Sequence, residues 1–227
     1  MVARRLLVAA VFVAVALVPT GVSASLSTAS RAMTVYRLRS DARLCPSPLC
    51  GGFWATRVNQ ITTTCLGGIA RPACYVASID LSALAPAVQA RVRPALASGR
   101  ALVTGVFARY SIDEFPQLAT LVAARVWLAA GPNRDAGTVY RIVDTGLRCI
   151  RAPCFSLRAT VVNGTRALTL SSLDLAGTGA SATAIGRAHA ALAHGGVLAA
   201  GTIRAAAKTG TPEAGRALAA TQVWLPA

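Results

Sequence analysis

The hydrophobic pattern predicts the same order of elements twice along the chain. In residues 34–130, apolar and polar positions alternate through TVYRLR, FWATRVN and CYVASID, as is typical of half-buried strands. A helix is expected within 86–98, and two further strands follow as ALVTGVFARY and LATLVAARVWL. Residues 138–227 repeat this order, with a helix within 181–194. Each stretch therefore predicts three strands, one helix and two more strands.

The two stretches also align residue by residue. Residues 34–59 match residues 138–163 at a constant offset of 104, with ten identities in 26 positions. The match resumes after an insertion in the first stretch and ends on VWL in both. Collinear matches of this kind indicate a duplication. The expected parts are a first repeat domain at 34–130, a linker at 131–137 and a second repeat domain at 138–227.

The first 24 residues, 1–24, have the pattern of a secretory signal peptide. Arg4 and Arg5 precede an apolar run, and Ala24 ends a stretch of small residues, which is the usual order of such a signal. The apolar run is too short to cross a bilayer, which takes about 20 apolar residues. We therefore expect cleavage after Ala24, a linker over 25–33, a secreted or periplasmic location, and no membrane span in the mature chain.

All six cysteines follow the predicted signal, and an even number in an exported protein predicts disulfides. A pair that recurs at one spacing in both domains is expected to be bonded within each domain. The pair found only in the insertion is expected to close an extra hairpin. The predicted bonds are Cys45–Cys50, Cys149–Cys154 and Cys65–Cys74. The alternative is a four-thiolate zinc site built from the two Cys-x4-Cys loops, since their spacing permits it.

The chain is strongly basic, with 23 Lys and Arg against 8 Asp and Glu and a net charge of +15. Loss of Arg4 and Arg5 with the signal lowers this charge by two, to +13. A basic surface attracts polyanions, so the expected partners are an anionic envelope polymer or a secreted protein. The arginines are scattered, without the basic run that marks nucleic-acid binding. The alternative is that the charge reflects composition alone.

The sequence predicts no catalytic, cofactor-binding or metal-binding residues. The two histidines, His189 and His194, are five residues apart on the second predicted helix, which places them on different faces. Nucleophile elbows, phosphate loops and paired carboxylates are not found. We therefore expect a protein that is not an enzyme and needs no cofactor.

Recurring aromatic residues form the candidate ligand surface. Their matched positions in the two domains are Tyr36 and Tyr140, and Trp127 and Trp224. An exposed tryptophan beside a polar residue on the same strand face could bind a sugar or a peptide. The alternative is that all four side chains pack in the core, as buried aromatic residues usually do.

The element order of each domain is that of a five-stranded OB-type barrel, which has a helix between strands three and four. Gly105 and Gly201 lie in mid-strand, where glycine suits a bend at a barrel corner. The expected fold is mostly β with one helix per repeat (α+β), as tandem five-stranded OB-like barrels. The alternative is a pair of open antiparallel sheets, each covered by one helix.

The repeated landmarks are Tyr-Arg, Cys-x4-Cys, Asp-Leu and a terminal Trp. This motif resembles a family of uncharacterised exported bacterial proteins built from the same tandem repeat, and the resemblance implies no activity. We therefore expect a non-enzymatic binding or structural module of the cell envelope or exterior. The alternatives are an inhibitor of a secreted enzyme, which would present a disulfide-stapled loop, and an enzyme with an unrecognised site.

Overall fold

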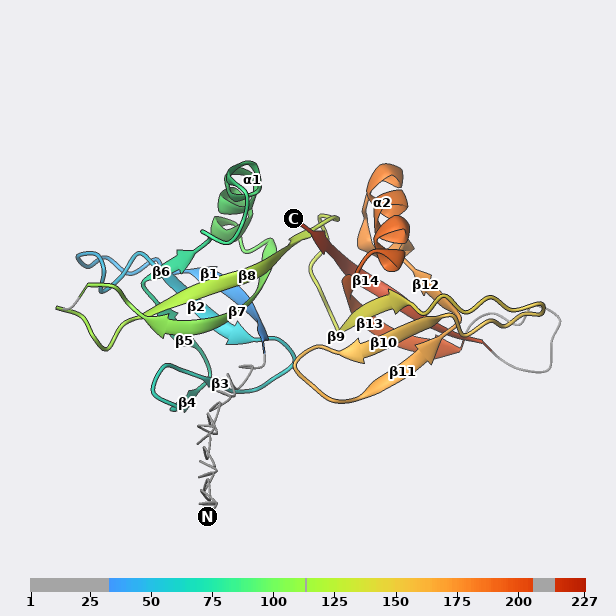
Figure 1. The fold of residues 1–227 in the computed structure, drawn as a ribbon, viewed down its shortest axis with the longest axis horizontal. Helices are drawn as coiled ribbons and strands as arrows, with labels where there is room; N and C mark the ends of the chain where they lie inside the picture. The colour runs from blue at the N-terminus through green and yellow to red at the C-terminus, as the bar shows by residue number, and fades with distance from the viewer. Residues whose placement is uncertain (1–32, 113, 206–214) are drawn as a thin grey trace, which may run out of the picture. The chain divides into compact units, whose positions relative to one another are not determined.

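The computed structural model describes residues 33–112, 114–205 and 215–227 (Figure 1). The predicted signal peptide, and the linker after it up to residue 32, lie outside the described residues. We call residues 34–130 the first half and residues 138–227 the second half.

The first half contains eight strands and one helix, in an order that includes every predicted element. They are β1 (Thr34–Ser40), β2 (Phe53–Arg57), β3 (Thr63–Thr64), β4 (Ala70–Arg71), β5 (Cys74–Val76), β6 (Ser78–Asp80), α1 (Pro86–Ala97), β7 (Ala101–Arg109) and β8 (Ala119–Ala129). The predicted third strand is divided into β5 and β6. The short strands β3 and β4 pair with each other in the predicted extra hairpin.

The second half has the same order of elements without that extra hairpin. They are β9 (Thr138–Asp144), β10 (Leu157–Val161), β11 (Ala167–Leu170), β12 (Ser172–Asp174), the 3-10 helix η1 (Ala176–Thr178), α2 (Ala182–Ala193), β13 (Val197–Ala205) and β14 (Arg216–Pro226).

Strands of both halves belong to one large sheet, in the order β11-β10-β9-β13-β14-β8-β7-β1-β2-β5. The two halves meet where β8 pairs antiparallel with β14, with Leu128 opposite Leu225. Two further bonds extend this ladder. The Ala130 N–H donates to the Val223 carbonyl at 2.9 Å, and the Ala227 N–H to the Val126 carbonyl at 3.0 Å.

The expectation of tandem OB-like barrels is not supported, because the hydrogen-bonded path runs through both halves as one sheet. The contact that would close each half is limited to short parallel pairs off this path. These pairs, β6 with β8 and β12 with β14, each align three residues. The alternative of open, mainly antiparallel sheets that each carry one helix fits the structure.

Each half has its own apolar core, and its helix packs on that core (Figure 1). In the first half, Val92 of α1 is buried with Leu38 and other strand residues. In the second half, Leu192 of α2 is buried with Leu218. Because helix and strands share these cores, the sheet is apolar on the side that each helix covers.

Local sequence signals explain where the two helices begin and end. Pro86 stands at the start of α1, where its fixed φ and missing N–H suit the first turn. The Ser181 hydroxyl caps α2 by accepting from the Ala184 N–H at 3.3 Å. Gly99 follows α1 with a φ of 68°, a left-handed conformation that ends helices.

A third apolar cluster joins the halves and lies under the β8–β14 contact. It takes nearly equivalent residues from each half: Val58, Leu102 and Trp127 from the first, Val139, Val162, Leu198, Ala200 and Trp224 from the second. Burial of such a shared cluster stabilises the joint, because apolar burial contributes about 25 cal/mol per Å².

All three predicted disulfides are present. Cys45 is bonded to Cys50, Cys149 to Cys154, and Cys65 to Cys74, with Cα–Cα distances of 5.5–5.7 Å. The cysteines of the alternative zinc site are therefore paired as disulfides within their own loops.

Candidate functional site

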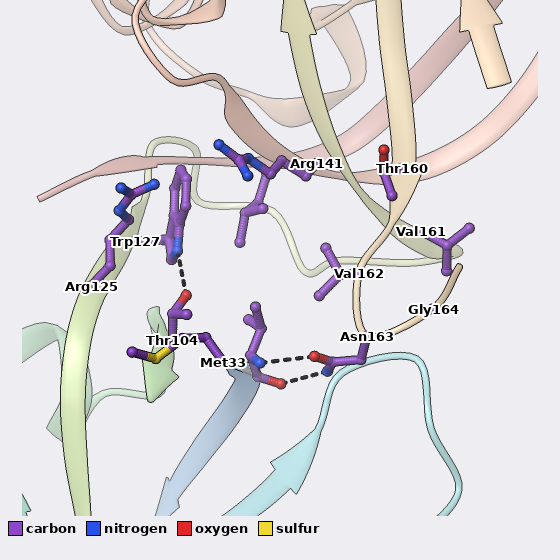
Figure 2. A pocket seen from close by; sticks show the side chains of 12 residues that line it. Met33, Thr104, Arg125, Trp127, Arg141, Thr160, Val161, Val162, Asn163 and Gly164 are labelled. Atoms are coloured by element: carbon purple, nitrogen blue, oxygen red, sulfur yellow. Dashed lines mark hydrogen bonds between the residues drawn. The ribbon is translucent and has the colours of Figure 1, made fainter. Parts of the chain in front are cut away.

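A groove lies where the two halves meet, and residues from both line it (Figure 2). Its cavity volume is about 330 Å³. We call it the joint groove and define it by its principal residues: Val35, Arg125 and Trp127 from the first half, and Arg141, Val162 and Asn163 from the second.

Asn163 forms the floor of the joint groove by binding the backbone of the first half. Its Oδ1 accepts from the Val35 N–H at 2.9 Å, and its Nδ2 donates to the Val35 carbonyl at 2.7 Å (Figure 2). The Nδ2 also donates to the Val58 carbonyl at 2.9 Å. The residue has a φ of 58°, a left-handed conformation that Asn tolerates better than most residues. The side chain is therefore held in one orientation by three bonds.

Asn59 makes the equivalent contacts in the opposite direction. Its Oδ1 accepts from the Val139 N–H at 2.9 Å, and its Nδ2 donates to the carbonyls of Val139 at 2.7 Å and Val162 at 3.0 Å. Its φ is 60°. The two asparagines thus exchange the same bonds between the halves, so the joint is approximately two-fold symmetric.

Arg125 and Trp127 lie on one face of β8 at the wall of the groove. The Trp127 Nε1–H donates to the Thr104 hydroxyl at 3.0 Å. The Arg125 guanidinium carbon lies 5.4 Å from the centre of the indole ring, within the range of a cation–π contact. The arginine is exposed, whereas the tryptophan is only 3% exposed. The charge therefore faces the groove and the ring supports it.

Arg141 reaches toward Trp127 from the second half (Figure 2). It is exposed, and its Nη2 donates to the Gly195 carbonyl at 3.0 Å. Within the described ranges, neither Arg141 nor Arg125 forms an ion pair. The joint groove therefore presents two guanidinium groups that no described carboxylate neutralises.

A second groove contains the equivalents of several of these residues. Its volume is about 540 Å³, and it is lined by Arg37 and Asn59, which correspond to Arg141 and Asn163 at the offset of 104. Here the linker between the halves forms one wall, and we call this cavity the linker groove. The Asp135 carboxylate of the linker forms an ion pair with Arg37.

The linker also covers the strand face that carries Trp224. Gln222, which corresponds to Arg125, is buried and donates to the carbonyls of Gly131 at 2.9 Å and Asn133 at 2.6 Å. The N–H and carbonyl of Ala136 both bond the Thr221 hydroxyl at 2.9 Å. The two grooves thus have related walls, but among the described residues the linker lines only one of them and supplies a carboxylate to its arginine.

The linker groove also contains an arginine that forms no ion pair in the described structure. Arg57 lines it, and the buried Nε of this residue has no hydrogen-bond partner among the described atoms. The corresponding residue of the joint groove is Val161. In the linker groove, Arg37 is therefore neutralised by Asp135. In the joint groove, neither Arg125 nor Arg141 is neutralised by a described carboxylate.

The four aromatic residues of the candidate ligand surface are all buried, with exposed fractions of 5% for Tyr36, 9% for Tyr140, 3% for Trp127 and 4% for Trp224. The Tyr36 ring centre lies 4.7 Å from that of Phe107, and burial raises the pKa of the Tyr36 hydroxyl. All four side chains therefore pack in the core, as the alternative to a ligand surface stated. Trp127 alone among them lines the joint groove.

Sequence reasoning did not single out Arg141, Asn163 or Asp135 as site residues. The identity of Asn59 and Asn163 in the repeat was a usable signal, since both end a strand at the same position. The linker aspartate had no counterpart in the repeat to mark it. His189, on α2, and His194, just after its end, are exposed and line neither groove. Within the described ranges, no cluster of His, Cys, Asp and Glu could hold a metal ion.

The Cys45–Cys50 loop is held by a second polar cluster, whose residues line neither groove. Asp41 accepts from Arg43 Nε at 2.9 and 3.0 Å and from Trp54 Nε1 at 3.2 Å. The Arg43 guanidinium carbon lies 5.0 Å from the ring centres of both Trp54 and Tyr75. The hydrogen bond from Arg43 lowers the pKa of Asp41 from 3.8 to about 2.

This pKa predicts an acid-sensitive loop. The lowered pKa means that the carboxylate stabilises the folded protein fully above about pH 4, and that this contribution is lost as the pH falls toward 2. We expect Asp41→Asn to be less stable than wild type at pH 6 and nearly equal to it at pH 2, by urea unfolding followed through tryptophan fluorescence. Glu114→Gln is the control for loss of a carboxylate. Equal destabilisation by Asp41→Asn at both pH values would contradict the prediction.

Three disulfides are typical of proteins that work outside the cytoplasm. No helix within the described ranges combines the length and hydropathy needed to cross a membrane. No curated protein and no solved structure matches the chain. The model of one family, described as "Domain of unknown function (DUF6748)", matches residues 34–227, and the chain belongs to that family.

Proposed function

We propose that this protein is a non-enzymatic, exported binding module that holds an anionic ligand in the joint groove. The observation that carries the proposal is the difference between the two grooves. Arg37 is paired with Asp135 of the chain itself, whereas the equivalent Arg141 has no carboxylate partner in the described structure. An anion supplied by a ligand would complete the same pair.

The chemistry of the groove supports binding rather than reaction. Its described lining offers guanidinium, hydroxyl and amide groups on an apolar wall, and it includes no carboxylate, imidazole or thiol. Guanidinium groups form strong, charge-assisted hydrogen bonds to carboxylates and phosphates. The charge of +13 that remains after loss of Arg4 and Arg5 adds long-range attraction, which speeds the encounter with an anionic polymer or an acidic protein.

A second candidate function is an inhibitor that presents its disulfide loops to a secreted enzyme. Each Cys-x4-Cys loop has fully exposed apolar side chains beside it or within it, Leu44 in the first half and Ile150 in the second. Exposed apolar residues on a rigid loop favour contact with another protein. The proposal of anion binding is preferred because the grooves differ in charge at matched positions.

Arg141→Gln tests the proposed function. The probes are a uronic-acid oligosaccharide, tripolyphosphate and oligoglutamate, titrated by calorimetry at about 0.05 M salt. We expect at least one probe to bind, and the variant to weaken it about tenfold, because a hydrogen bond between charged groups contributes about 1.5–3 kcal/mol. Arg93→Gln, an exposed residue on α1, is the control with the same loss of charge. Equal weakening by both variants would contradict a specific site.

A further inference from the structure

Resting on this proposed function, we propose that the ligand of the joint groove is an acidic peptide segment of another protein. It would lie along β8 beside Arg125 and Trp127, as the linker lies along β14 beside Thr221 and Gln222. The linker is itself a segment that is bound at the equivalent place in the structure. Because the joint is approximately two-fold symmetric, a segment in the joint groove is expected at the equivalent position.

The linker shows how a segment binds beside β14. Its backbone carbonyls at Gly131 and Asn133 accept from Gln222, and the backbone of Ala136 bonds Thr221. Its carboxylate, at Asp135, binds across the joint to Arg37. The segment is thus recognised both through its backbone and through one acidic side chain.

The joint groove has a different set of hydrogen-bond donors at the positions that match Gln222 and Thr221. Arg125 replaces Gln222, and the Thr221 position is Ala124. The Gln222 amide both donates to Gly131 and accepts from its N–H, whereas a guanidinium only donates. A segment in the joint groove must therefore offer acceptors at both arginines, and two carboxylates meet this demand best.

In the linker, the backbone carbonyl of Asn133 accepts from Gln222, and the side chain of Asp135, two residues later, binds Arg37. In the joint groove a side-chain acceptor would take the place of that carbonyl, and side chains two residues apart in an extended segment point to the same side at roughly 7 Å. An Asp-x-Asp segment would place one carboxylate near Arg125 and the next near Arg141.

The chain before β1 does not offer these carboxylates. No Asp or Glu precedes Asp41 in the sequence, and the position that corresponds to Asp135 at the offset of 104 is Arg31. Arginine at that position is not an acidic partner for Arg141, so we infer that the acidic segment belongs to another protein.

Two synthetic peptides based on the linker sequence test the inference with the full protein. One is acetyl-Gly-Pro-Asp-Ala-Asp-Ala-Gly-amide, and the other has Asn in place of both Asp residues. We expect the acidic peptide to bind, and the Asn peptide to bind at least tenfold more weakly, because hydrogen bonds between charged groups are lost. Arg125→Gln and Arg141→Gln should each weaken the acidic peptide several-fold, and Arg93→Gln should leave its affinity within twofold of wild type.

The outcomes separate this inference from the proposed function. If tripolyphosphate or the uronic-acid oligosaccharide binds through Arg141 and the acidic peptide does not, the peptide inference is wrong and anion binding stands. If no probe depends on Arg141, both fail. If the acidic peptide binds equally well to Arg141→Gln, it occupies another surface and the inference is overturned.

Discussion

Asn163→Ala is expected to lower the free energy of unfolding by about 2–4 kcal/mol, because a lost bond leaves a buried backbone group unpaired at a cost of about 1–3 kcal/mol. The side chain makes three bonds to Val35 and Val58. Alanine can replace none of them, and it also resists the left-handed φ of 58° at this position. The loss should be seen in urea unfolding at neutral pH.

Two further variants separate the causes. Asn163→Gly removes the same bonds but accepts the left-handed backbone, so its difference from Asn163→Ala measures the conformational cost alone. Asn133→Ala, in the linker, removes one exposed bond of 2.8 Å to the Gly177 carbonyl and should cost less than about 1 kcal/mol. If Asn163→Ala costs no more than Asn133→Ala, the side chain does not hold the two halves together.

The order of elements and the disulfides could be predicted because they follow from local patterns and from the internal alignment. Strand alternation gave β1 and β9 at the same offset, and the helices α1 and α2 begin within the expected ranges. The recurring cysteine pairs left one reasonable pairing for the remaining two. These predictions do not depend on how the strands of the two halves pair with each other.

The joint and its groove could not be predicted, because they depend on long-range pairing. Nothing local to β8 or β14 shows that each pairs beyond its own half, and this pairing makes one sheet where separate barrels were expected. For the same reason the sequence left open whether Trp127 and Trp224 form a ligand surface or pack in the core, because both are buried in the cluster that joins the halves. The charge difference between the grooves arises from another long-range contact, the ion pair between Asp135 of the linker and Arg37.

The mid-strand glycines were expected at barrel corners, but Gly105 and Gly201 lie instead at register shifts within the open sheet, and Gly201 gives the second large expected effect. The register between β13 and β14 shifts at Ala200 and Gly201, which leaves Thr221 as an extra residue, as in a β-bulge. A Cβ atom on Gly201 would lie 2.2 Å from the carbonyl oxygen of Ala219. Gly201→Ala should therefore force the strands apart and cost about 3 kcal/mol or more, in the range of severe steric changes in a core.

The same substitution elsewhere provides the matched control for Gly201→Ala. Gly186 lies inside α2, and a Cβ atom there would have no neighbour within 4 Å. Alanine is the better helix former by about 0.5–1 kcal/mol, so Gly186→Ala should raise the midpoint of urea unfolding while Gly201→Ala lowers it. Gly105→Ala should behave like Gly201→Ala, because its Cβ would lie 2.2 Å from the Val122 carbonyl oxygen at the equivalent shift between β7 and β8. A neutral result at both strand glycines would show that the sheet relaxes around the added methyl group and that the bulges do not require glycine.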